Sequence, residues 1–241
     1  MLSEETLFRV WEAGVDRPPL ARTVAMLGAA GTVRTGEDPA VLPIGARDLE
    51  LLSLREQAFG CDVTAVAACP DCTVRVEIRF RTDDVRLPTV AQPEPLSVES
   101  EGYIVRFRLP NTTDLLSMEF AGDEHEDGRR ILERCVSQAT LDGAPVSAGA
   151  LPEALQKAVD TAMAAADPQA EVELSIKCPA CARRWTELFD IDSFFWTELQ
   201  AWGARILREI HQLASAYGWS EREILALPPL RRNTYLNLIA E

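Results

Sequence analysis

Two short cysteine motifs, each reading Cys-Pro-x-Cys, constrain this chain more than any other feature of its sequence. Cys69 and Cys72 form the first pair, and Cys178 and Cys181 form the second. A CxxC turn presents two thiolates from one tight loop, and two such turns supply the four soft ligands that a structural zinc ion takes in a tetrahedron. The sequence therefore predicts that all four cysteines converge on one structural Zn²⁺.

The segments around the two motifs predict a zinc ribbon that is split along the chain. Residues 62–69 and 73–80 flank the first pair, and residues 171–177 lead into the second. Apolar and polar side chains alternate in these segments, as they do in half-buried strands. Because 105 residues, 73 to 177, separate the pairs, the ribbon is expected to form the neck of an insertion.

Two other interpretations of the cysteine pairs stay open at this point: unrelated turns, and a redox-active pair. A redox pair needs a thiolate stabilised at a helix N-terminus, whereas a strand leads into each pair here. A catalytic zinc needs an open coordination position and a nearby general base, and no histidine stands close to either motif. Cys61 and Cys135 lie outside the motifs, and Cys135 is expected to be a buried thiol in a helix.

The rest of the pattern predicts an α+β fold that is mostly helical, with the split zinc ribbon and an inserted α/β subdomain. The expected division is an N-terminal helical segment at 1–60, the first half of the ribbon at 61–87, the inserted subdomain at 88–170, the second half of the ribbon at 171–192, and a C-terminal helical module at 193–241.

Within the insertion, residues 103–109 alternate like a strand. From residue 114 to residue 167 the apolar spacing predicts helices, interrupted by an acidic loop at 123–127. These assignments give the insertion its α/β character.

Capping signals place several helix ends. Asp48 is expected to cap the helix that follows it, because aspartate accepts hydrogen bonds from first-turn N–H groups. A long helix is expected from about residue 193 to Tyr217, with apolar residues at three- and four-residue steps along one face. Ser220 and Glu223 then form a capping box for a short helix.

The charge balance narrows the choice of partners. Acidic side chains outnumber basic ones by 38 to 24, a formal net charge of -14. Such a surface repels phosphate backbones, so nucleic acid is not an expected partner. Membrane insertion is not expected either, because no run approaches the roughly 18 apolar residues that a spanning helix needs. The first residues lack a cationic region of the kind that opens a secretory signal, so the cytoplasm is the expected location.

Three blocks of sequence resemble a known family. They lie at residues 42–60 (LPIGARDLELLSLREQAFG), 167–199 and 216–236. In this order they resemble the T-even-phage-type baseplate hub assembly chaperones of contractile phage tails and phage-tail-like injection systems. The resemblance implies a non-enzymatic assembly factor that binds baseplate hub, spike or tape-measure proteins, in the cytoplasm of the producing cell or in the assembled particle. A zinc-stapled adaptor subunit retained in the baseplate is the alternative, and a zinc or thiol enzyme is a remote one.

The resemblance also implies roles for single residues. The four cysteines of the two motifs carry over as the zinc ligands. The C-terminal block resembles a short module found beside phage tail genes, and the residues that match it are Tyr217, Gly218, Trp219, Ser220, Glu221, Arg231, Arg232 and Tyr235. Trp219, Arg231, Arg232 and Tyr235 are expected to contact a partner, because these residue types dominate interface hot spots. Core packing is the competing interpretation for Trp219, and pairing with nearby acids is the competing one for the two arginines.

Overall fold

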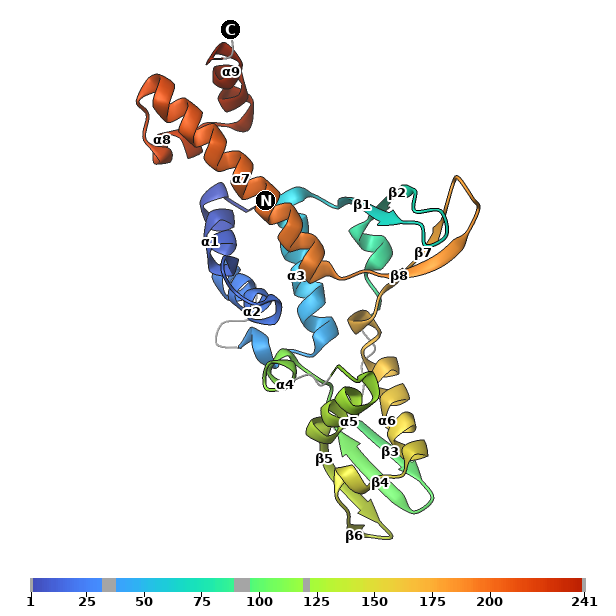
Figure 1. Ribbon diagram of the computed structural model, residues 1–241. Coiled ribbons are helices and arrows are strands. Elements are labelled where there is room, and N and C mark those ends of the chain that lie inside the picture. The colour runs from blue at the N-terminus through green and yellow to red at the C-terminus, as the bar shows by residue number, and fades with distance from the viewer. Residues whose placement is uncertain (1, 32–37, 89–95, 119–121, 240–241) are drawn as a thin grey trace.

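The computed structural model describes residues 2–31, 38–88, 96–118 and 122–239, which form three parts (Figure 1). A helical body carries the C-terminal helices at one end. Two β-hairpins extend from its side, and a small sheet with its helices lies at the end away from the C-terminus. Each part has its own cluster of buried apolar residues. This mixture of helices and small sheets confirms the predicted α+β class.

The helical body packs α1 (Glu4–Gly14), α2 (Pro19–Ala30) and α3 (Ile44–Phe59) against the long helix α7 (Ile191–Tyr217). The long helix predicted at about 193–217 is therefore confirmed, and it starts two residues earlier. Its apolar residues recur at helical spacing and are buried: Phe195, Leu199, Trp202, Ile206, Ile210 and Leu213.

Two glycines allow α1 and α7 to approach closely. Trp11 of α1 lies against Gly203 of α7, where an added Cβ would come within 2.9 Å of the indole ring. Trp196 of α7 lies against Gly14 of α1 in the same way, and there the distance would be 2.5 Å. Each helix thus places a tryptophan on the glycine of the other, and this reciprocal contact fixes how they cross.

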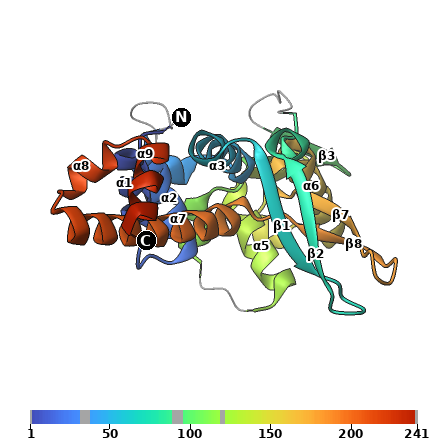
Figure 2. The ribbon, with the colours of Figure 1, turned by 90° about the horizontal axis from the view of Figure 1, so that it is seen from above.

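Two antiparallel hairpins form the second part. The first pairs β1 (Asp62–Ala68) with β2 (Arg75–Arg81), and the second pairs β7 (Glu173–Lys177) with β8 (Arg184–Leu188). Seen from above, the hairpins lie at the end of the molecule opposite to the C-terminal helices α8 (Glu221–Leu225) and α9 (Pro229–Ile239) (Figure 2).

Aromatic rings connect the hairpins to the helical body. Phe80 of β2 contacts Phe189, which follows β8, with ring centroids 5.2 Å apart. Phe189 in turn contacts Phe194 of α7 at 5.6 Å. The base of both hairpins is therefore continuous with the core of the body.

The third part is a four-stranded antiparallel sheet in the order β3-β4-β5-β6. The helices α5 (Glu124–Cys135) and α6 (Glu153–Ala166) pack against it. The strands are β3 (Leu96–Ser100), β4 (Tyr103–Phe107), β5 (Val136–Leu141) and β6 (Ala144–Pro145). The thiol of Cys135 belongs to the buried core of this part and is 1% exposed, as the sequence predicts.

The prediction of a helical pattern from 114 to 167, interrupted only by the acidic loop, is wrong at residues 136–141, which form β5. Helix α5 ends at Cys135, and β5 pairs with β4 so that Ala139 lies opposite Val105. Asp142 and Gly143 then turn the chain into β6 with φ of 50° and 84°, the conformation of a type I′ hairpin. Sheet pairing therefore overrides a local pattern that favours helix, although the Asp-Gly pair is a hairpin signal in the sequence.

Three smaller expectations are also corrected. Residues 123–127 are not a loop: Asp123 caps α5 by accepting from the N–H groups of His125 and Glu126. Asp48 does not cap α3, because the helix begins at Ile44 and the N–H of Gly45 donates instead to Asp167 at 2.8 Å. The strand β3, which lies just after proline-rich sequence, was not predicted from the pattern.

The C-terminal module consists of α8 (Glu221–Leu225) and α9 (Pro229–Ile239). Gly218 ends α7 in the left-handed conformation with φ of 69°. Ser220 and Glu223 form the predicted capping box, since each side chain bonds to the backbone N–H of the other.

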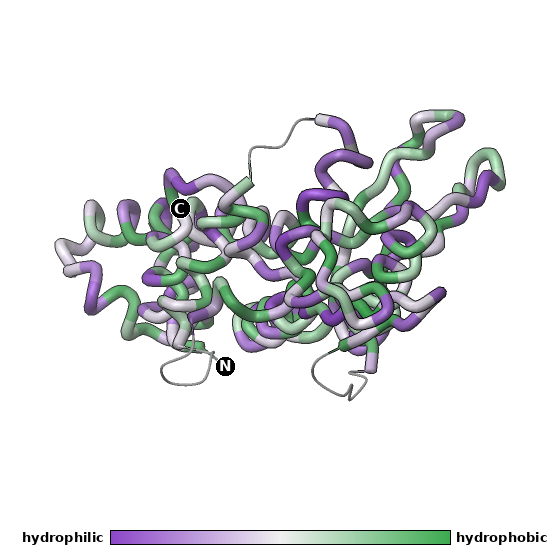
Figure 3. Tube along the Cα trace, turned by 90° about the horizontal axis from the view of Figure 1, so that it is seen from below, coloured by the Kyte–Doolittle hydropathy of each residue, from purple (hydrophilic) through white to green (hydrophobic). Residues whose placement is uncertain are grey.

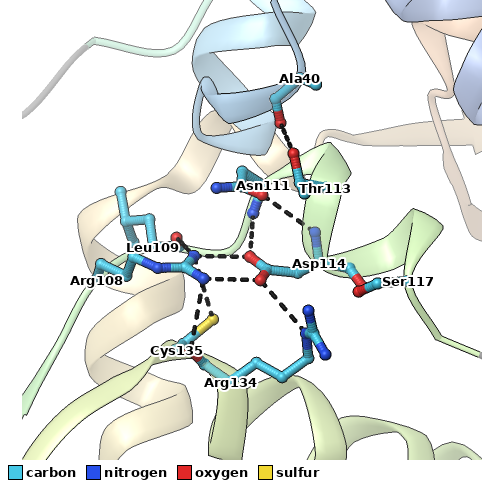
Figure 4. A network of polar contacts seen from close by, with 9 residues as sticks. All are labelled: Ala40, Arg108, Leu109, Asn111, Thr113, Asp114, Ser117, Arg134 and Cys135. Carbon is cyan, nitrogen blue, oxygen red and sulfur yellow. Dashed lines mark hydrogen bonds and ion pairs between the residues drawn. The ribbon is translucent and has the colours of Figure 1, made fainter. Parts of the chain in front are cut away.

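A buried carboxylate fastens the sheet part to the body through α4 (Thr112–Leu116), as Figure 4 shows. Asp114 accepts two hydrogen bonds from Arg108, at 2.6 and 2.7 Å, and lies 3.5 Å from Arg134. Beside it, the hydroxyl of Thr113 donates to the carbonyl of Ala40 in the short helix η1 (Pro39–Val41). The junction is therefore polar and specific, and the Arg108–Asp114 pair holds the pKa of Asp114 below its usual range.

Among the described residues, no helix is both long and apolar enough to cross a membrane. Figure 3 shows the reason, because hydrophilic residues interrupt the hydrophobic ones along the helices.

Candidate metal centre

The first cysteine pair lies in a turn with a defined hydrogen-bond pattern. The N–H of Cys69 donates to the carbonyl of Val74 at 2.9 Å, and the N–H of Thr73 donates to the carbonyl of Cys69 at 2.9 Å. Thr73 takes the left-handed conformation, with φ of 59°, which costs an L-residue roughly 1–2 kcal/mol. Two backbone hydrogen bonds thus stabilise the turn between β1 and β2, although Thr73 adopts an unfavourable backbone conformation in it.

The second cysteine pair repeats this pattern. The N–H of Cys178 donates to the carbonyl of Arg183 at 2.8 Å, and the N–H of Ala182 donates to the carbonyl of Cys178 at 3.0 Å. Ala182 has φ of 62°. Both bonds and the strained residue fall at the same positions as in the first turn, so the two Cys-Pro-x-Cys sequences fold into the same loop.

The two turns bring all four sulfurs together. The four Sγ atoms lie within 4.8 Å of one another. The shortest contacts cross between the hairpins: Cys69 Sγ to Cys181 Sγ, and Cys72 Sγ to Cys178 Sγ, each at 3.6 Å. A tetrahedron with metal–sulfur bonds of about 2.3 Å has edges of about 3.8 Å. The cluster therefore has the size and the donor set for one thiophilic metal ion.

Burial differs within each pair. The first cysteine of each turn, Cys69 or Cys178, is buried, whereas Cys72 is partly exposed and Cys181 is exposed. Val76 and Ile176, one from each hairpin, pack beneath the cluster. The metal position thus lies between a small apolar core and the tips of the hairpins.

The thiols of the cluster differ in how readily they ionise. Backbone N–H groups of Cys181 and Ala180 stabilise the thiolate of Cys178 and lower its pKa to about 7. For Cys181 the backbone hydrogen bond from Arg183 acts in the same sense, but partial desolvation by the packed turns and hydrogen bonds with the neighbouring sulfurs outweigh it and raise the pKa to about 12. A bound divalent cation supplies the positive charge that lets all four thiols deprotonate together.

The arrangement suits coordination rather than catalysis. Four protein sulfurs fill the four positions of a tetrahedral ion and leave none open for a substrate. Within the described residues, the cluster contains no histidine and no carboxylate. An ion pair between Asp71 and Arg183 links the two turns across 3.8 Å and is half exposed, so it contributes little stability.

The predicted partner-binding residues lie together at the C-terminal end. Trp219 stacks on Tyr217 with ring centroids 4.7 Å apart, and Tyr235 meets Trp219 edge-on at 4.9 Å. Arg231 is exposed, whereas Arg232 is 3% exposed. The structure therefore brings the aromatic residues into one cluster, exposes Arg231 and buries Arg232 against the body.

The partners of Arg232 are residues that the sequence did not single out. Glu4 of α1 accepts from its Nη1 and Nη2 atoms, and Glu209 of α7 lies 2.9 Å from its Nε atom. Glu4 lies three residues before the first buried residue of α1, and nothing in the sequence around it indicates this contact. A pair that spans nearly the whole chain cannot be found from spacing.

The fold and the site define a protein in which two distant hairpins form one four-cysteine site that can hold a metal ion. The chain belongs to the family of T4 bacteriophage base plate proteins, whose profile matches residues 29–196. The match spans α3, both hairpins and the inserted sheet, and it ends in the second turn of α7. No curated protein and no solved structure matches the chain. The baseplate part of the predicted resemblance is thereby confirmed.

Proposed function

We propose that this base plate protein is a non-enzymatic assembly factor for the hub of a contractile phage tail or phage-tail-like injection system. It acts through contacts with hub, spike or tape-measure proteins. Membership of the base plate family carries the proposal. The site supports the absence of chemistry, because the four sulfurs can saturate a metal ion. The acidic surface also suits contacts that form fast and weaken with salt.

The metal in the proposed function is Zn²⁺, and its role is to staple the fold. Cys69, Cys72, Cys178 and Cys181 are the proposed ligands. Soft thiolate ligands in a tetrahedron select zinc among the common divalent ions of cells. Because the two pairs are far apart in sequence, the ion closes a long loop and anchors both ends of the insertion.

We also propose that the chain works as five segments. These are the helical segment 1–60, the ribbon halves 61–87 and 171–192, the inserted subdomain 88–170 and the C-terminal module 193–241. The separate apolar cluster of the inserted sheet supports the idea that it folds around its own core. Partner contacts are assigned to the C-terminal module, which carries Trp219, Arg231, Arg232 and Tyr235. In this proposal the exposed Arg231 contacts the partner directly, whereas the buried Arg232 acts by holding α9 on the body through Glu4 and Glu209.

The test is a deletion of the gene in cells that produce the particle. We expect no contractile particles by electron microscopy, and little or none of this protein by mass spectrometry of purified wild-type particles. We also propose that the protein acts in the cytoplasm of the producing cell during assembly. Normal particles from the deletion strain would refute a role in assembly. Stoichiometric protein in mature baseplates would instead identify a retained adaptor subunit.

A further inference from the structure

The two close sulfur contacts of the metal centre join one hairpin to the other. Cys69 Sγ lies 3.6 Å from Cys181 Sγ, and Cys72 Sγ lies 3.6 Å from Cys178 Sγ. An S–S bond is about 2.05 Å long, so each pair must approach by roughly 1.5 Å. Rotation of two cysteine side chains supplies a shift of this size without moving the turns. Both pairs can therefore become disulfides between the hairpins.

Each of these pairs combines a buried sulfur with a more accessible one. Cys69 is buried and its neighbour Cys181 is exposed, and Cys178 is buried while its neighbour Cys72 is partly exposed. An oxidant that arrives from solvent meets the accessible sulfur first, and a second sulfur is already in contact with it. Redox-sensitive sites combine an accessible reactive thiol with a neighbouring resolving cysteine in the same way.

The pairing decides what oxidation does to the fold. Bonds within each turn, from Cys69 to Cys72 and from Cys178 to Cys181, would leave the two hairpins unlinked once the metal ion is lost. Bonds between the hairpins keep the neck of the insertion closed, because they join the same distant segments as the ion does. A crosslink over so long a loop restrains the unfolded chain strongly.

We propose that the four-cysteine centre is a redox-convertible staple. A hydroperoxide oxidises it to two disulfides, Cys69–Cys181 and Cys72–Cys178, with release of the metal ion, and the neck of the insertion stays closed. In a reducing cytoplasm the thiols stay reduced and the metal form persists, whereas the disulfide form belongs to oxidising surroundings. The inference rests on the proposed metal staple and does not depend on the proposed role in assembly.

The conversion balances with two molecules of hydrogen peroxide. Sulfurs that ligate a divalent ion are thiolates. The thiolate of Cys181 attacks one peroxide oxygen, the O–O bond breaks, and Cys181 becomes a sulfenic acid while hydroxide leaves and takes up a proton. The thiolate of Cys69 then attacks the sulfur of Cys181, so the S–S bond forms, the S–O bond breaks, and a second hydroxide leaves as water. The same steps at Cys72 and Cys178 use the second peroxide, and the four sulfurs lose four electrons in all.

Disulfide mapping of the zinc-loaded, full-length protein tests the proposal. Two equivalents of hydrogen peroxide are expected to release about one equivalent of zinc, measured with a chromogenic chelator. Proteolytic cleavage before Asp71 separates Cys69 from Cys72, so each should be found bonded to the peptide of residues 178–183, and fragment spectra assign the partners. Dithiothreitol with added zinc should restore the metal form. Bonds within the turns, sulfinic acids in place of disulfides, or zinc that stays bound would each overturn the proposal.

Thermal melting in a chelator tests whether the oxidised centre still staples the fold. EDTA is expected to lower the melting temperature of the reduced, zinc-loaded protein by at least about 10 °C, and that of the oxidised protein by less than about 2 °C. Cys61→Ser should behave as the wild type in every measurement, because Cys61 lies outside the cluster. An oxidised protein that melts like the reduced protein in EDTA would show that oxidation opens the neck.

The outcomes also separate this inference from the proposed staple. If the purified protein binds no zinc under any condition, the staple and the inference fail together. If it binds zinc through the four cysteines and oxidation joins other pairs, the staple stands and only the inference fails.

Discussion

Arg232, nine residues before the C-terminal residue, donates two hydrogen bonds to Glu4, near the N-terminus, at 2.6 and 2.7 Å. The arginine side chain is 4% exposed and that of Glu4 is 26% exposed. The bidentate contact raises the pKa of Arg232 above its ordinary value, so the guanidinium stays charged. The first and last helices of the described chain are thus joined by a largely desolvated ion pair.

Replacing Arg232 by leucine should destabilise the whole protein. The change leaves the carboxylates of Glu4 and Glu209 without their main partner, and breaking such a pair costs about 2–4 kcal/mol when the sites are partly exposed. Urea denaturation measures the loss. Arg231→Leu is the matched control, because Arg231 is exposed and should change stability by less than about 0.5 kcal/mol. Equal effects of the two substitutions would contradict this assignment.

Truncation is not a suitable test of binding by the C-terminal module, because the module also contributes to the core of the body. Ile224 of α8 is 0% exposed and belongs to the core cluster of the body, together with Leu213 of α7. Removing all residues after Gly218 would therefore expose core side chains as well as removing a binding surface. Point substitutions on the outer face of α9 test binding without this complication.

Loss of a metal ligand should unfold the hairpins and destabilise the chain. Cys178→Ser is expected to lower the zinc content from about one equivalent to near zero, and to cost several kcal/mol, on the order of a crosslink that closes a long loop. Metal analysis and thermal melting measure the two effects. Cys61→Ser is the control, since Cys61 lies outside the four-sulfur cluster. Full zinc binding by the Cys178 variant would argue against this set of ligands.

Two glycine-to-alanine substitutions should have opposite effects on stability. One lies where α1 crosses α7, and the other lies in α5. At Gly203 a Cβ would lie 2.9 Å from the ring of Trp11, so Gly203→Ala forces the helices apart and should cost about 1–3 kcal/mol. An added Cβ at Gly128 in α5 would meet nothing within 4 Å beyond its own turn of helix, and Gly128→Ala should stabilise by up to about 1 kcal/mol through helix propensity. Denaturation midpoints distinguish the two. A stabilising Gly203→Ala would show that α1 does not pack as described.

Local chemistry made much of this structure predictable. The two cysteine motifs fix their own turns, and the alternation of β2 and the periodicity of α7 both match the structure that these segments adopt. The convergence of the pairs followed from coordination chemistry, because four thiols are needed for one ion. The family resemblance added the baseplate assignment.

What could not be predicted depends on contacts between distant residues. Residues 136–141 have the sequence pattern of a helix, but they form the strand β5 because they pair with β4. The start of α3 is set by Asp167, whose carboxylate receives the N–H of Gly45 from across the insertion. Arg232 looked like a surface residue of a tail module, and only the fold brings Glu4 and Glu209 to it. In each case the local sequence is compatible with another structure, and long-range packing makes the choice.

The last prediction concerns Asp48, which the sequence suggests as the N-cap of α3. It lies inside α3, paired with Arg47 at 2.7 Å, and its side chain is 14% exposed. Burial raises the pKa of Asp48 to about 6, and the charges of Asp190 and Asp192 add to this, while Arg47 opposes it. The folded protein therefore binds a proton at Asp48 more tightly than the unfolded chain, whose carboxyl has an ordinary pKa of about 4.

Asp48→Asn should thus stabilise the protein in a pH-dependent way. The favourable protonation of Asp48 is present in full below about pH 4 and is lost as the pH rises through about 6, so wild-type stability falls across this window. Asparagine keeps the size and one acceptor for Arg47 but carries no charge, and its advantage should grow to at most about 3 kcal/mol at neutral pH. Urea denaturation at several pH values between about 4 and 8 measures the difference. Asp62→Asn, at a side chain that is 89% exposed, controls for the loss of one negative charge. An advantage that is the same at every pH, or that appears equally at Asp62, would show that burial does not hold the proton on Asp48.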